Sequence, residues 1–141
     1  MRRLLFLLPL LLAACAPVLQ GPAETLPPAT TAPGVLAVKD DAGHIFLNTD
    51  LGLFAPGGSV LFFQQYRGAE SESAFTHPWP FERLLAWLKA ELKRLGWRLV
   101  EAYVWEKPPT YQAKLILAKG DERRVVVLRL ENGRYHLSVQ R

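Results

Sequence analysis

The 141-residue sequence has a single cysteine, Cys15, and this scarcity excludes several kinds of site. One cysteine cannot form a disulfide within the chain, a Cys-x-x-Cys redox pair or a zinc site built from several thiolates. Any folded domain in this chain must therefore be stabilised by packing and hydrogen bonds alone.

Motifs for catalysis and cofactor binding are also lacking. There is no phosphate-binding glycine loop and no Gly-x-Ser-x-Gly motif. The histidines share no metal-ligand spacing; they are His44, His77 and His136. Because active sites need several convergent polar groups, we expect no enzymatic activity, no catalytic residues and no cofactor.

One group of oxygen-bearing side chains deserves a test as a calcium site. It consists of Asp40, Asp41, Asn48 and Asp50. The group lacks the alternating ligand spacing and the distal bidentate Glu of a calcium loop. Because Asp and Asn are common turn residues, we interpret the group as turn chemistry and expect no metal.

The sequence has no strong excess of positive or negative residues. The formal net charge is +4 and falls to +2 without Arg2 and Arg3, which gives no electrostatic case for binding nucleic acid. The charge is uneven, at −3 over residues 35–80 and +6 over residues 81–141. The basic half could face anionic lipid or an acidic partner, but a solvated sheet face carrying Arg and Lys is the simpler interpretation.

No apolar run is long enough to cross a bilayer, which needs roughly 20 residues. The longest candidate is Leu4 to Leu12, which follows Arg2 and Arg3 and is interrupted by Pro9. A basic start, a short apolar middle and small residues at the end indicate a secretory signal.

The residues Leu12-Ala13-Ala14-Cys15 close this leader and resemble the lipobox of bacterial lipoproteins at all four positions. The resemblance implies that the Cys15 thiol receives a diacylglyceryl group, that cleavage occurs just before Cys15, and that the new amine is acylated, for example with palmitate. Two alternatives remain. General signal peptidase could cut after Ala16, although Pro17 would then be a poor new N-terminus, or the leader could stay as an uncleaved anchor, for which it is short.

The resemblance places the protein in the cell envelope, lipid-anchored on the extracytoplasmic side. Ala16 after the cysteine resembles sorting to the outer membrane in diderm bacteria. We divide the chain into a signal peptide (1–14), a lipidated Cys15 with a Pro-rich linker (15–34) and one globular domain (35–141). The linker has five prolines and no apolar period, so we expect it to be extended and disordered.

The first half of the domain predicts short strands and loops. Residues 35–38 and 44–47 are apolar and flank a turn-like stretch at 40–43, which predicts a hairpin. Residues 59–66 read as a strand. Residues 68–80 are rich in Ser, Glu and Pro, and we expect them to form a loop.

The second half predicts one helix followed by four strands. Apolar residues recur at helical spacing from Phe81 to Leu95, and Gly96 is suited to a left-handed stop after which Trp97 folds back. The predicted strands are 97–106, 110–119, 122–131 and 134–140, and Asn132-Gly133 is a strong hairpin signal.

The two-residue turns fix a register for the last three strands. An Asn132-Gly133 turn pairs Leu128 with Leu137, and a Gly120-Asp121 turn pairs Leu115 with Val126. Both hairpins then place their apolar side chains on one shared face, against which we expect the helix to pack.

Alternation along residues 97–106 places Trp97, Tyr103 and Trp105 on one face of their strand, interrupted by Glu101. An exposed aromatic patch usually marks a binding surface. We expect instead that residues 35–66 fold across this face, because that apolar segment must bury itself somewhere. If the face is open, the candidate binding residues are Trp79, Trp97, Tyr103 and Trp105.

The sequence therefore predicts a two-layer α+β fold. One antiparallel sheet with a C-terminal four-stranded meander packs against one long helix in the order β-α-β-β-β-β, with an N-terminal hairpin added. We expect a lipid-anchored, non-enzymatic binding or assembly module with an envelope protein as its partner. The alternative is a carrier or sensor that holds a small apolar ligand between helix and sheet, in a pocket of at least about 300 Å³.

Overall fold

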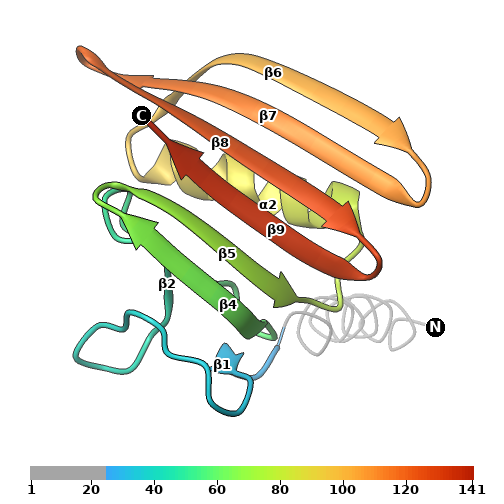
Figure 1. Cartoon of the computed structure of the whole chain (residues 1–141). Coiled ribbons are helices and arrows are strands. Elements are labelled where there is room, and N and C mark those ends of the chain that lie inside the picture. Colours follow the sequence, from blue (N-terminus) through green and yellow to red (C-terminus); the bar gives the residue numbers. More distant parts are fainter. Residues whose placement is uncertain (1–24) are drawn as a thin grey trace, which may run out of the picture.

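The computed structural model describes residues 25–141, so the leader, Cys15 and the first part of the linker lie outside the described residues. The described chain has one helix on one face of a seven-stranded sheet, beside a small two-stranded sheet (Figure 1). This arrangement confirms the predicted α+β fold class with a single helix packed on a sheet.

The large sheet is mixed, and its spatial order is β1-β4-β5-β9-β8-β7-β6. All neighbours are antiparallel except β1 and β4, which are parallel. In chain order its strands are β1 (Thr30–Thr31), β4 (Val60–Arg67), β5 (Glu70–Thr76), β6 (Arg98–Lys107), β7 (Thr110–Lys119), β8 (Glu122–Glu131) and β9 (Arg134–Gln140).

Helix α2 (Phe81–Arg94) forms where the helical spacing predicts it. Its buried side chains include Leu84, Leu88 and Leu92, each of which contributes about 1.5–3 kcal/mol by leaving water. Gly96 ends the helix at φ 96°, a left-handed conformation that glycine adopts without strain. The Trp97 amide then donates to the Leu92 carbonyl at 2.9 Å, which folds Trp97 back onto the last turn as predicted.

The meander from β6 to β9 has the predicted register. Leu128 pairs with Leu137 across one hairpin, and Leu115 pairs with Val126 across the other. These four side chains are at most 1% exposed, and they face α2 in one continuous core. The face of the sheet that carries them is called the helix-side face below.

The prediction of a loop at residues 68–80 is wrong, because β5 (Glu70–Thr76) lies between β4 and β9 inside the sheet. Its helix-side positions include Ser71 and Ser73, which are buried and pair with Val139 and Leu137. Both serine hydroxyls donate to the Leu47 carbonyl, at 3.2 and 3.5 Å. Buried serines satisfied in this way remove the apolar alternation that identifies a strand in a sequence.

The N-terminal segment packs beside α2 on the helix-side face, over β4 and β5. It contains the two-stranded sheet of β2 (Phe46–Asn48) and β3 (Leu53–Phe54), and Leu47, Leu51 and Leu53 join the core. The expected hairpin is reduced to one bridge between Lys39 and Ile45. The expectation that this segment covers the face carrying Tyr103 and Trp105 is therefore wrong.

The last residues of the expected linker contact the domain. Thr30 and Thr31 form β1 beside Val60 and Leu61 of β4, and the Thr30 amide donates to the Ser59 carbonyl at 2.9 Å. This finding differs from the expected disordered linker, which extended to residue 34. Without β1, β4 would be an edge strand with unpaired backbone N–H and C=O groups, and β1 binds to these groups as a parallel strand.

Candidate binding surfaces around strand β6

Strand β6 is the open edge of the large sheet. It is last in the strand order, and β7 is its one neighbour among the described residues. Each of its ten residues is exposed. An edge strand presents unpaired backbone N–H and C=O groups to which another extended chain can bind.

Tyr103 and Trp105 project from β6 on the face opposite α2, which we call the outer face. They are 56% and 52% exposed, and they pair with Lys114 and Gln112 of β7. Across the part of the chain that the structure describes, no element covers them. This open aromatic pair is the part of the predicted binding surface that the structure brings together.

Trp97 lies on the other side of the sheet and is 6% exposed. The register of β6 shifts between Leu99, which pairs with Leu117, and Glu101, which pairs with Ile116. Val100 is thus an extra residue, and such a bulge reverses the alternation that follows it. Simple alternation therefore placed Trp97 wrongly on the same face as Tyr103 and Trp105.

Trp79 is half-buried two residues before α2 and contacts β9, which is three strands from β6 in the sheet. The Tyr135 hydroxyl donates to its carbonyl at 2.6 Å, and burial raises the pKa of Tyr135 to about 12. The Arg83 guanidinium lies 4.5 Å from the centre of the Trp79 ring. These contacts hold Trp79 against the core, apart from the β6 surface.

Glu101 is exposed on the outer face and accepts a hydrogen bond from the Tyr103 hydroxyl. This hydrogen bond, followed by the negative charge of the carboxylate, raises the pKa of Tyr103. The phenol is therefore a neutral donor at physiological pH, and its ring is held at a fixed position along β6.

A second surface lies on the helix-side face, between α2 and strands β6 and β7. It is a groove of about 440 Å³, called the α2–β6 groove below. Its apolar walls are formed by Leu92, Trp97, Leu99, Leu115 and Leu117. Lys89, Lys93 and Arg98 also line it, and no acidic residue of the described part of the chain does so. Sequence reasoning raised a pocket between helix and sheet only as an alternative and named Trp97 alone among these residues as a binding candidate, because a groove depends on how far the helix extends over the sheet.

Trp97 forms a fixed wall of this groove. Lys119 Nζ and the Arg124 guanidinium lie 5.7 and 5.5 Å from the centre of its ring, close enough for cation–π attraction. Lys119 also donates to the Leu95 carbonyl at the end of α2, at 3.1 Å. Both cations therefore contact the Trp97 ring, and Lys119 also stabilises the end of α2.

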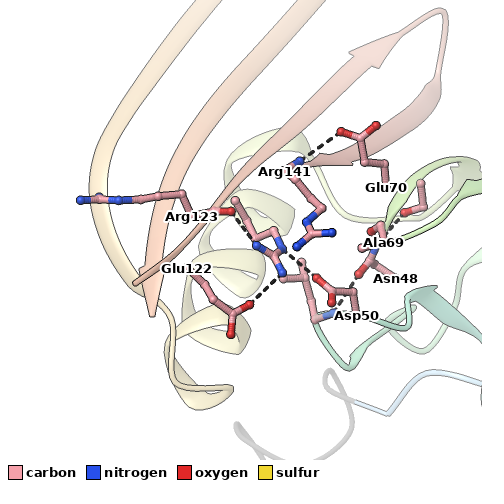
Figure 2. Close-up of polar contacts among 10 residues, drawn as sticks. Asn48, Asp50, Ala69, Glu70, Glu122, Arg123 and Arg141 are labelled. Carbon is pink, nitrogen blue, oxygen red and sulfur yellow. Dashed lines mark hydrogen bonds and ion pairs between the residues drawn. The ribbon is translucent and has the colours of Figure 1, made fainter. Parts of the chain in front are cut away.

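Arg124 is the one charged residue among the buried side chains of residues 25–141, and it is 4% exposed. Figure 2 shows its surroundings, where Asp50, Glu122 and the Arg123 carbonyl converge. Its guanidinium donates to these three acceptors at 2.7, 2.8 and 2.7 Å. The hydrogen bond to Asp50 is the main cause of the raised pKa of Arg124. With these acceptors in place, Arg124 joins β8 to the N-terminal segment.

The acidic group considered as a calcium site forms turns, as interpreted. Asp40 Oδ1 accepts the amides of Ala42 and His44 at 3.0 and 2.8 Å. Asn48 Oδ1 accepts the Leu51 amide at 2.8 Å, and its amide nitrogen donates to the Ala69 carbonyl at 3.0 Å (Figure 2). Within residues 25–141, no three His, Cys, Asp or Glu side chains form a group able to hold a metal ion.

Among residues 25–141, no helix is long enough and apolar enough to cross a membrane. No protein family model, no curated protein and no solved structure matches this chain.

Proposed function

We propose that this protein is a lipid-anchored, non-enzymatic binding module of the cell envelope that recognises a protein partner through β6. The anchor is supported by the sequence Leu12-Ala13-Ala14-Cys15 after a short secretory leader. The location follows from the anchor, on the extracytoplasmic side of a membrane and on the outer membrane in a diderm cell.

The observation that carries the proposal is the exposure of β6 along its whole length, with Tyr103 and Trp105 uncovered. Trp and Tyr are enriched among the residues that contribute most to protein interfaces. An extended segment of a partner would pair its backbone with β6 and place alternate side chains against these two rings. The exposed Lys114 opposite Tyr103 favours an acidic segment.

The bulge at Val100 and the Pro108-Pro109 pair limit where a partner strand can bind. A bulge disrupts pairing locally, and proline lacks an amide donor. The regular part of β6 between them runs from Glu101 to Lys107. This part is long enough for a typical strand of about 5–6 residues.

The proposal is tested by affinity purification of the full chain from solubilised membranes. Trp105→Ala should reduce recovery of the partner and leave thermal stability nearly unchanged. Leu36→Ala is the control, since Leu36 is 90% exposed and lies two residues before Val38, whose amide donates to Gln64 of β4, near the opposite edge of the sheet from β6. Equal recovery with both variants would contradict a β6 interface.

The α2–β6 groove favours a second candidate function, a carrier or sensor of an apolar ligand. Its volume of about 440 Å³ falls within the range of small-molecule sites, which is about 300–1,000 Å³. Apolar walls with a few polar groups at one side are also typical of such sites.

A further inference from the structure

The α2–β6 groove exists because α2 leaves the helix-side face of β6 uncovered. Helix α2 lies behind the central strands in Figure 1. Leu99 and Val104, which face that side from β6, are 41% and 50% exposed. Leu92, Leu115 and Leu117 are at most 1% exposed, so they support the groove from beneath. An apolar chain in the groove would therefore meet chiefly Leu99 and the alkyl stems of the lining lysines, over this packed support.

The charges around the groove have one sign. Lys89, Lys93 and Arg98 line it, and within residues 25–141 none of the three forms an ion pair. The nearest acid on the helix is Glu91, whose carboxylate is bound by Arg94 at 2.8 Å. Lys89 and Lys93 are four residues apart on α2, so they lie on the same side of the helix. Together they provide two cations for one negative group.

We propose that the α2–β6 groove binds a long-chain fatty acid. The acyl chain lies along Leu99 and the edge of the Trp97 ring, and the carboxylate lies between Lys89 and Lys93. The apolar walls stabilise the chain by removing it from water, and the unpaired lysines stabilise the anion. A single chain suits a groove in the lower half of the volume range for small-molecule sites.

This inference rests on the second candidate function, and the experiment separates the two. The full chain is placed in phosphatidylcholine nanodiscs and exposed to diazirine-bearing palmitate, to the matching diazirine-bearing hexadecanol, or to a diazirine-bearing lysophosphatidylglycerol. The sites of photolabelling are then mapped by mass spectrometry. Hexadecanol has the same chain without the charge, and the lysolipid has an anionic head of another kind.

The variant Lys89→Glu/Lys93→Glu reverses the charge at the groove, and Lys39→Glu/Arg123→Glu, at two exposed cations outside the groove lining, is the control. We expect palmitate to label residues within 89–99 and 115–117. Labelling should fall about tenfold in the groove variant and less than about twofold in the control, because the groove variant replaces two attractions for the carboxylate with two repulsions. Labelling by hexadecanol should be nearly unchanged in both variants.

A second pair of variants tests the apolar wall. Leu99→Glu should reduce labelling by both palmitate and hexadecanol, and Val38→Glu, which is equally exposed but lies in the N-terminal segment outside the groove lining, should not. If no probe labels the groove, the carrier function and the fatty-acid site both fail. If palmitate and hexadecanol label it equally in every variant, the carrier function stands and the anionic ligand is overturned. Stronger labelling by the lysolipid than by palmitate overturns the fatty-acid assignment.

Discussion

The Arg124 guanidinium donates through Nε to Asp50 Oδ2 at 2.7 Å, and the two residues are 74 positions apart in the sequence. Arg124 lies at a helix-side position of β8, opposite Leu117, where the other strands carry apolar residues. Asp50 belongs to the turn between β2 and β3. The pair thus fixes the N-terminal segment against the meander, beside the end of α2.

Removing Asp50 should destabilise the fold, because a buried cation would lose one of its acceptors. Asp50→Ala is expected to lower the free energy of unfolding by about 1.5–3 kcal/mol, as for hydrogen bonds to charged groups. Chemical denaturation measures the loss. Asp41→Ala, at an exposed acid nine positions earlier, should cost less than about 0.5 kcal/mol. Equal losses in the two variants would show that the ion pair does not join the segments.

The two tryptophans of the β6 region should respond differently to truncation. Trp97→Ala removes a side chain that is 6% exposed and should cost about 3–5 kcal/mol. Trp105→Ala removes one that is 52% exposed and should cost less than about 1 kcal/mol. Thermal unfolding of both variants provides the comparison. A large loss with Trp105→Ala would place that ring in the core and remove it from the proposed interface.

His77 should make the protein less stable in acid. Its Nε2 lies 2.7 Å from the Gly57 carbonyl and donates to it, and its Nδ1 lies 3.1 Å from the Trp79 amide and accepts from it. Only the neutral ring can do both. Burial, together with the positive charge of Arg83, lowers the pKa of His77 below its ordinary value of 6.5.

The unfolded chain therefore binds a proton at His77 before the folded chain does. Stability from this group is complete above about pH 6.5 and is lost as the pH falls toward the folded pKa. His77→Gln should reduce the difference in urea midpoint between about pH 7.5 and about pH 5.5. The pKa of His136 is also lowered, chiefly by burial, so part of the difference should remain. An unchanged pH dependence in His77→Gln would contradict this role.

The anchor depends on the thiol of Cys15. Cys15→Ser should prevent transfer of the diacylglyceryl group, because a hydroxyl cannot replace the thiol in that reaction. Intact-mass measurement of the membrane fraction should show the acyl mass on the unaltered chain and its absence from the variant. An unmodified Cys15 in the unaltered chain would contradict the lipoprotein assignment.

The meander and the helix could be predicted because several local signals agree there. The turn at Asn132-Gly133, the alternation of apolar residues and the glycine after the helix all specify one arrangement. These local signals were absent from β5, where polar side chains occupy buried positions. Ser71 and Ser73 occupy core positions of β5 through hydrogen bonds to a segment more than 20 residues away, which local periodicity cannot report.

The candidate site was predictable in part. Tyr103 and Trp105 share the outer face as alternation requires, but the bulge at Val100 separates them from Trp97. A Gly120-Asp121 turn that pairs Leu115 with Val126 also pairs Leu117 with Arg124, and this charged residue at an apolar position was the available signal for a buried ion pair. The α2–β6 groove depends on the tertiary position of the helix, and no sequence pattern records that position.

The central claim, that β6 is a protein-binding edge, is tested most directly by photocrosslinking in intact cells. The crosslinker p-benzoylphenylalanine is placed at position 103 of the full chain, and in a parallel experiment at position 36, where the natural Leu36 is 90% exposed. A β6 interface predicts one discrete adduct from position 103, which is weakened by Trp105→Ala in the same chain, and none of that mass from position 36. The absence of an adduct at position 103, or the same adduct from both positions, would contradict the claim.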